Sequence, residues 1–183
     1  MLEQDVIQYV EGDLFKSLDD VTNSGMLVVI PHVVNDEKVW GAGFVMPLAQ
    51  RFPQARDAYL GDPSLKLGDT QFVTVARNVI VANMVAQSFG QEPPLRYDAL
   101  DKCLSEVARK VDGEMAAAHS RQASWSHAEI RCPLFGAGIA GGDWAEIEKM
   151  ICERWRGLTV GIYYLPQFLP PSFKPPPAQR SQP

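Results

Sequence analysis

The chain has 183 residues, of which 46% are hydrophobic, and a formal net charge of −5 at pH 7. This length suits one domain with a sizeable core, and the negative charge excludes a general attraction to nucleic acid or to an anionic membrane surface. The three cysteines, Cys103, Cys132 and Cys152, form no CxxC pair. Their wide spacing argues against a zinc site and against a disulfide framework, so we expect no bound metal and a reducing, cytoplasmic location.

The N-terminal sequence MLEQDVIQYVEGD carries acidic residues where a secretory signal needs a basic patch and an apolar run. No segment reaches the length that a membrane-spanning helix requires. We therefore expect a protein that is not exported and does not contact a membrane.

The first half of the chain predicts two strands, a helix and a hairpin of two further strands. Residues 5–10 and 26–31 have strand-like composition, and the apolar run of the second suits the middle of a sheet. Apolar residues recur at three- and four-residue spacing over residues 45–60, which predicts a helix kinked at Pro53. Two strands, 69–76 and 78–82, are expected to form the hairpin.

The second half repeats strand, glycine loop and helix. Residues 98–119 predict a long helix capped by Asp98, and residues 129–134 a short strand. A glycine-rich loop follows, then a helix over 143–156 and a last strand over 158–165. Strands that alternate with helices predict an α/β fold, a three-layer sandwich with a central mixed β-sheet flanked by helices.

Proline is concentrated at the C-terminal end of the chain. Seven of the fourteen prolines lie from Pro166 onward, where no regular hydrophobic pattern is present. Such a composition is typical of an extended, flexible segment. We expect a domain over residues 1–166 and a proline-rich flexible tail over residues 167–183.

Two glycine loops stand between a predicted strand and a predicted helix. Gly41-Ala42-Gly43 follows the strand over 26–31, and Phe135–Gly142 follows the strand over 129–134. Glycine lets the backbone approach a ligand closely, and N–H groups at the start of a helix favour an anion. Both loops also suit plain tight turns. Because ligands of such folds collect at the carboxyl ends of the strands, the loops predict a site for a phosphate-bearing ligand.

Three motifs occur in order along the chain: Glu11-Gly12-Asp13-Leu14, then His32, Asn35 and Gly41-Ala42-Gly43, then the run from Gly136 to Trp144. With these motifs, residues 5–166 resemble the macrodomain family of ADP-ribose-binding folds. Within the family the chain is most similar to the ADP-ribose-1″-phosphate phosphatases and the related glycohydrolases that remove ADP-ribose from acidic side chains. The resemblance implies hydrolysis at C1″ of the distal ribose, of a 1″-phosphate or of an ADP-ribosyl ester on protein or nucleic acid.

The resemblance also implies a role for each matching residue. Asp13 would accept from the adenine amino group, Asn35 would bind the distal ribose, and the loop from Gly136 to Ala140 would wrap the diphosphate. Without the other motifs, Asp13 would be more typical of a turn or cap residue. The implied ligand-binding residues are Asp13, Leu14, Asn35, Trp40, Gly41, Ala42, Gly43, Gln87, Gly136, Ala137, Gly138, Ile139, Ala140 and Tyr164.

The catalytic residues implied are His32, Asn35 and Asp143. His32 would attack or protonate a phosphoryl group, with Asp143 as its acid/base partner. Two structural alternatives stay open, because a histidine at a strand end is often merely hydrogen-bonded and Asp143 suits the N-cap of its helix. His119 and His127 are interpreted as surface residues.

Two departures from the family pattern support a second hypothesis. Residues 83–87 lack the lysine of the glycohydrolases that use a lysine nucleophile, and Ala140 stands where their aspartate lies. The alternative is thus a non-catalytic ADP-ribose reader; a third is a nucleotide-binding scaffold whose tail recruits a partner. We expect no cofactor, ADP-ribose or a derivative as ligand, ADP-ribosylated macromolecules as partners, and a monomer.

Overall fold

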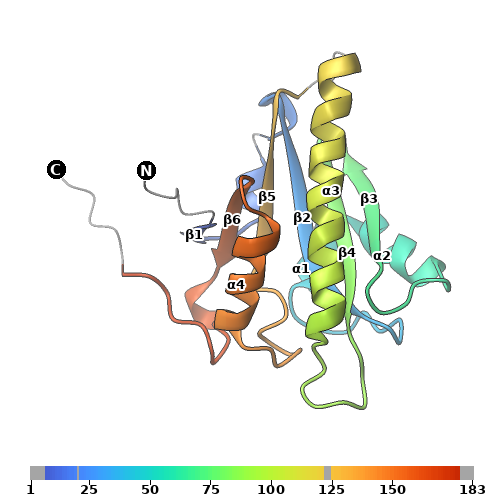
Figure 1. Ribbon diagram of the computed structural model, residues 1–183, viewed down its shortest axis with the longest axis vertical. Helices are drawn as coiled ribbons and strands as arrows, with labels where there is room; N and C mark the ends of the chain where they lie inside the picture. The colour runs from blue at the N-terminus through green and yellow to red at the C-terminus, as the bar shows by residue number, and fades with distance from the viewer. Residues whose placement is uncertain (1–6, 20, 122–124, 178–183) are drawn as a thin grey trace.

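The computed structural model describes residues 7–19, 21–121 and 125–177 (Figure 1). Its six-stranded sheet has the order β1-β6-β5-β2-β4-β3. Neighbouring strands are parallel, except that β3 runs antiparallel to β4. The predicted mixed sheet is therefore confirmed. The strands are β1 (Ile7–Glu11), β2 (Met26–Asn35), β3 (Thr70–Ala76), β4 (Val79–Gln87), β5 (His127–Pro133) and β6 (Thr159–Tyr164).

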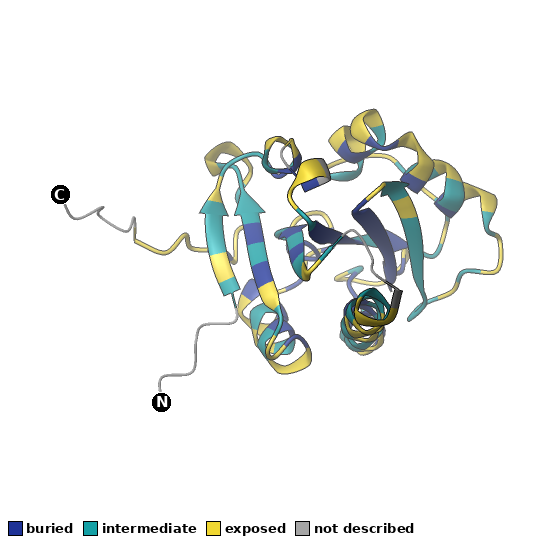
Figure 2. Ribbon diagram, turned by 90° about the horizontal axis from the view of Figure 1, so that it is seen from above, coloured by how far each residue is buried: buried dark blue, intermediate teal, exposed yellow. Residues whose placement is uncertain are grey.

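Helices cover both faces of this sheet (Figure 2). The long helices α3 and α4 pack on one face, and α1, α2, η1 and η2 pack on the other. This arrangement confirms the predicted three-layer sandwich. The helices are α1 (Val45–Arg51), α2 (Pro53–Gly61), α3 (Tyr97–Arg121) and α4 (Trp144–Arg154), with short 3-10 turns η1 (Lys16–Leu18), η2 (Val21–Asn23) and η3 (Pro166–Phe168). None of the helices described is both long and apolar enough to cross a membrane.

The strand β2 lies inside the sheet, paired with β4 on one side and β5 on the other. Successive side chains of a strand point to opposite faces, so Leu27 and Val29 join the α3 side while Val28 and Ile30 join the α1 side. Pairing with β4 continues beyond the apolar run, through His32 opposite Asn83. The strand thus ends at Asn35, four residues later than predicted, and His32 lies within the strand instead of just after it.

The predicted helix over 45–60 is two helices. Phe52 has φ −135° and ψ 74°, which is outside the helical region, and Pro53 begins α2. Proline has no N–H to donate within a helix but suits its first position, so the chain breaks here instead of bending. Asp98 lies in the first turn of α3, which begins one residue earlier, at Tyr97.

The segment after η3, expected to be a flexible tail, is anchored in the core at Phe173, while residues 174–177 beyond it are exposed. Phe173 is 6% exposed and packs within the core cluster on the α4 side. Burial of one aromatic ring contributes about 2 kcal/mol, enough to hold a segment whose prolines already restrict its backbone. Residues 178–183 of the predicted tail, and residues 5–6 of the first predicted strand, lie outside the described residues. The domain boundary at residue 166 stays a prediction.

Candidate ligand-binding site

Loops that follow the parallel strands meet at one edge of the sheet, at the lower end of Figure 1. The N–H of Gly12 after β1 donates to the carbonyl oxygen of Tyr164 at 2.9 Å. The N–H of Leu95 after β4 donates to the carbonyl oxygen of Ala140 after β5, also at 2.9 Å. A Cβ placed on Gly43 would lie 3.5 Å from Cδ1 of Ile139, so the two glycine loops touch.

The loop between β5 and α4 folds back on itself. The N–H of Gly141 donates to the Gly138 carbonyl oxygen at 3.0 Å, and that of Gly142 to the Gly136 carbonyl oxygen at 2.8 Å. Gly136 and Gly141 have φ of 76° and 68°, a conformation that favours glycine. Within the described part of the chain, no acceptor takes the N–H groups of residues 137–140. Four consecutive free donors beside a second glycine loop suit an anionic ligand.

The start of α4, in contrast, is satisfied by the protein itself. The Asp143 N–H donates to the Tyr97 hydroxyl at 2.8 Å, and the Trp144 N–H to the Ser172 hydroxyl at 3.0 Å. The Asp143 carboxylate accepts the Ala145 N–H at 2.8 Å and is the N-cap of the helix. An anion at this site would therefore meet the loop N–H groups rather than the first N–H groups of the helix. A catalytic role for Asp143 stays a prediction.

Asn35 holds the turn that follows β2. Its Oδ1 accepts the N–H of Glu37 at 3.1 Å, the N–H of Val39 at 3.0 Å and the hydroxyl of Tyr59 at 3.0 Å. Its Nδ2 donates to the Val39 carbonyl oxygen at 2.7 Å. One N–H of the amide is left over for a ligand. The turn is thus ordered by Asn35, and Lys38 within it donates to the Tyr59 carbonyl oxygen at 3.1 Å.

His32 lies in the core beneath this turn, with 2% of its surface exposed. Its Nε2 is 2.6 Å from Oδ1 of Asn83, and because a carboxamide oxygen only accepts, Nε2 carries the proton. Burial lowers the pKa of His32 to about 4, so the ring is neutral at pH 7. Nδ1 has no partner among the described residues, and the rings of Trp40 and Phe44 lie 5.6 and 5.9 Å from the imidazole.

Asp13 and Leu14 form the opposite end of the site. Asp13 Oδ1 accepts the Phe15 N–H at 2.9 Å, and this bond shapes a turn. The second carboxylate oxygen of Asp13 takes no part in that bond. Leu14 is buried, and the Phe15 ring stacks on Phe44 with centroids 5.4 Å apart. This stacking links the segment after β1 to the loop after β2.

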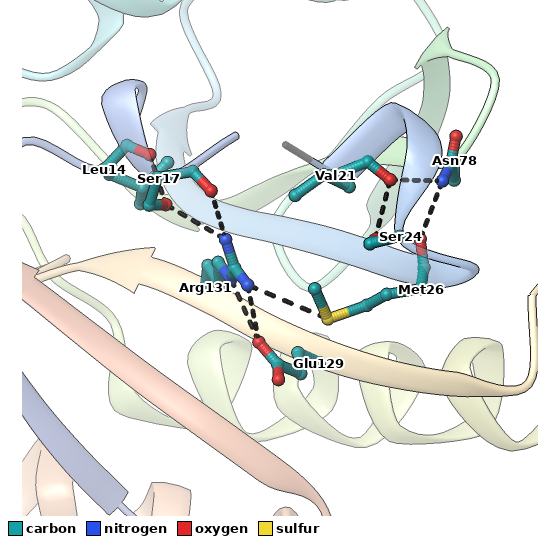
Figure 3. Close-up of polar contacts among 8 residues, drawn as sticks. All are labelled: Leu14, Ser17, Val21, Ser24, Met26, Asn78, Glu129 and Arg131. Carbon is teal, nitrogen blue, oxygen red and sulfur yellow. Dashed lines mark hydrogen bonds and ion pairs between the residues drawn. The ribbon is translucent and has the colours of Figure 1, made fainter. Parts of the chain in front are cut away.

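Arg131 and Asn78 fasten the η1–η2 segment to the sheet, as Figure 3 shows. The Arg131 guanidinium donates to the Ser17 carbonyl oxygen at 2.5 Å and pairs with Glu129 at 2.9 Å. Asn78 Nδ2 donates to the carbonyl oxygen of Val21 at 2.8 Å. Sequence reasoning missed both anchors, because neither side chain belongs to a motif.

Three other predicted ligand-binding residues lie at or after strand ends: Tyr164 at the end of β6, Gln87 at the end of β4, and Trp40 after β2. Tyr163 and Tyr164 face opposite sides of the sheet: Tyr163 packs on the cluster that holds Leu14, and Tyr164 packs against Phe173. Trp40 donates through Nε1 to the Val45 carbonyl oxygen at 3.0 Å. Gln87 is 9% exposed at the end of β4. Contact of Tyr164, Trp40 or Gln87 with a ligand stays a prediction.

His119 and His127 are exposed, as predicted. No group of three or more histidine, cysteine, aspartate or glutamate side chains that could hold a metal ion is found in residues 7–19, 21–121 and 125–177.

These features define an α/β domain whose glycine loops lie at the carboxyl edge of its sheet and form a candidate site for an anion. Among solved structures, a macrodomain protein from Streptomyces coelicolor is 33% identical to the chain, with a TM-score of 0.64 over 86% of this chain and 98% of that one. The chain therefore belongs to the macrodomain family.

Two further structures share this fold. A protein of unknown function from Bacteroides thetaiotaomicron is 31% identical, with a TM-score of 0.68 over 86% of this chain and 96% of that one. The Thermosipho africanus DarTG structure, in complex with ADP-ribose, is 16% identical, with a TM-score of 0.62 over 93% of this chain and 43% of that one. No family model and no curated protein matches the chain.

Proposed function

We propose that this macrodomain binds ADP-ribose across the carboxyl edge of its sheet. The loop from Gly136 to Gly142 carries this proposal, because its N–H groups at residues 137–140 have no acceptor in the part of the chain described and its Ile139 lies against Gly43. In this arrangement the diphosphate accepts from those N–H groups, adenine lies at Asp13, and the distal ribose lies at the Asn35 turn. The ADP-ribose in the DarTG structure, which shares the fold, supports the choice of ligand.

Asp13 would select the base. A carboxylate only accepts, so it suits the exocyclic amine of adenine and repels the carbonyl oxygen that hypoxanthine carries at the same position. The ligand predicted from this chemistry is ADP-ribose rather than its inosine analogue.

Calorimetric titration tests this proposal with the isosteric change Asp13→Asn. Asparagine keeps an oxygen for the Phe15 N–H but turns an amide N–H towards adenine, so we expect about tenfold weaker ADP-ribose binding. Asp62→Asn is a matched control, because Asp62 accepts the Ser64 N–H in the same way at 3.0 Å, next to the opposite edge strand of the sheet. Wild-type protein that binds no ADP-ribose would contradict the proposed function.

Hydrolysis at C1″ of the distal ribose is the second candidate function, and the unpartnered Nδ1 of His32 favours it. A neutral ring is the state that a base or nucleophile needs. A substrate reaches it only if Trp40 or Phe44 moves, since the ring is 2% exposed beneath them. The non-catalytic reader therefore fits the described arrangement better, in line with Ala140 and the lysine-free stretch 83–87.

Turnover assays separate these two functions. Release of phosphate from ADP-ribose-1″-phosphate, or of ADP-ribose from an ester-linked peptide, would establish hydrolysis, and loss of release in His32→Gln would assign it to this residue. Tight ADP-ribose binding with no release from either substrate would establish a reader.

The loops around the site also expose apolar side chains. Val39 is 50% exposed, Phe89 42% and Ile139 65%. A macromolecule that carries ADP-ribose would cover them, which is consistent with an ADP-ribosylated protein as partner. Monomeric state and cytoplasmic location stay predictions from the sequence.

A further inference from the structure

The segment that follows η3, residues 169–174, is here called the C-terminal strap. Its Phe173 ring packs against three other aromatic rings, with centroid distances of 5.3 Å to Tyr9, 5.3 Å to Tyr164 and 6.1 Å to Trp144. Two of these side chains are held by hydrogen bonds, because Trp144 Nε1 donates to the Tyr9 hydroxyl at 2.8 Å and that hydroxyl donates to Glu148 at 2.5 Å. The strap thus joins β1, β6 and α4.

Ser172 connects the strap to the glycine loop. Its hydroxyl accepts the N–H of Trp144, the first residue of α4, at 3.0 Å. The same hydroxyl donates to the carbonyl oxygen of Gly142, the last glycine of the loop, at 3.4 Å. A helix leaves its first N–H groups without partners inside the helix. The N-cap Asp143 accepts the N–H of Ala145, and Ser172, which lies outside the helix, accepts the N–H of Trp144.

Leu169 of the strap packs against the core cluster and Pro170 is buried, but the strap is not packed against the domain along its whole length. A cavity of about 300 Å³ lies beside it, lined by the strap, Tyr9 and the first turns of α4. The contacts of Ser172 and Phe173 therefore account for how the strap holds the start of α4.

We propose that Ser172 and Phe173 are positioning residues for the proposed ADP-ribose site, acting through the loop from Gly136 to Gly142. This inference rests on the proposed function. Free N–H groups bind an anion well only if they already point in one direction, because ordering them on binding costs free energy. Ser172 fixes the end of the loop at Gly142 and Trp144, and Phe173 fixes Ser172.

The test measures ADP-ribose affinity by calorimetry and amide hydrogen exchange of residues 136–144, well below the melting temperature. In Ser172→Ala we expect affinity to fall about three- to tenfold, the value of one or two hydrogen bonds, and loop amides to exchange faster. Ser172→Thr keeps the hydroxyl and should restore both. Phe173→Ala should reproduce the Ser172→Ala result and lower the melting temperature as well.

Phe168→Ala is the matched control, because Phe168 lies just before the strap and is 75% exposed. It should change neither affinity nor exchange. If wild type binds ADP-ribose and Ser172→Ala binds it equally well, the positioning role is overturned while the proposed function stands. A lower melting temperature with unchanged affinity would show that the strap is structural alone. Absence of binding in wild type would instead defeat the proposed function.

Discussion

His32 on β2 and Asn83 on β4 face each other across the parallel pair and share a hydrogen bond of 2.6 Å between Nε2 and Oδ1. Asn83 in turn donates to the Ala55 carbonyl oxygen and to Gln71 Oε1, both at 3.0 Å. A buried imidazole is thereby held in one tautomer by a network that reaches α2 and β3.

This burial predicts a pH-dependent stability. The pKa of His32 is lowered from 6.5 to about 4 in the folded chain, so between these values the unfolded chain binds a proton that the folded chain does not. Stability due to neutral His32 is complete above pH 6.5 and falls by about 1.4 kcal/mol per unit as pH drops towards 4. Urea unfolding at a series of pH values measures this slope.

His32→Gln is the comparison, because glutamine keeps an N–H donor for Asn83 and does not titrate. Its stability should depend less on pH in this window by the amount that His32 contributes. Equal slopes in both proteins would mean that other groups cause the acid sensitivity.

Substitution by alanine should have different effects on stability at two glycines of the loop between β5 and α4. A Cβ on Gly142 would lie 2.3 Å from Leu95 Cδ2 and 2.7 Å from the Gly136 carbonyl oxygen, and the latter is backbone that cannot easily move. We expect Gly142→Ala to cost about 3 kcal/mol of unfolding free energy. A Cβ on Gly138 meets no atom within 4 Å, so Gly138→Ala should change stability by less than about 1 kcal/mol. Thermal and urea unfolding test both.

Removal of the Asn35 side chain should loosen the turn after β2. Asn35→Ala removes the acceptor of two backbone N–H groups, and we expect a loss of about 2–4 kcal/mol. Asn35→Asp keeps the acceptor oxygens but not the donor to Val39, so its loss should be smaller. Similar losses in both variants would show that the single donor matters more than the acceptors.

The contributions of Arg131 and Glu129 to the free energy of unfolding should be coupled, because the two side chains form an ion pair. Their side chains are 11% and 28% exposed, so Arg131→Met leaves a partly buried carboxylate without its partner and should cost about 3 kcal/mol. Replacing Glu129 by Gln in addition should recover part of this loss, because the unpaired charge is gone. A double variant as unstable as the sum of the single variants would exclude coupling between the two residues.

Local patterns were sufficient for most of the fold. The apolar run from Met26 predicted a central strand, and proline chemistry predicted a disturbance at Pro53, although as a kink in one helix and not as the break between two. The end of β2 was missed because His32 and Asn35 are polar, and only pairing with β4 shows that the strand continues to Asn35. Phe173 was missed for a related reason, since one aromatic residue among prolines gives no periodic signal and its partner Tyr9 lies far away in sequence.

Less of the candidate site than of the fold could be predicted from the sequence. Motif spacing identified the two glycine loops, but it could not show that the Asn35 oxygen is already used by Glu37, Val39 and Tyr59. Nor could it show that His32 is enclosed. Asn83 contacts His32, Tyr59 contacts Asn35 and Ser172 contacts Trp144, each from an element that is distant in the sequence. A single sequence gives no direct sign of such contacts.

The pairing of β1 with β6 alone has a consequence for how the chain is made. During synthesis β1 has no partner in the sheet until residues 159–164 have also left the ribosome, and Tyr9 meets Phe173 later still. Closing the sheet is therefore a late, long-range event in synthesis, and a nascent chain interrupted before that point would expose an unpaired strand to its neighbours.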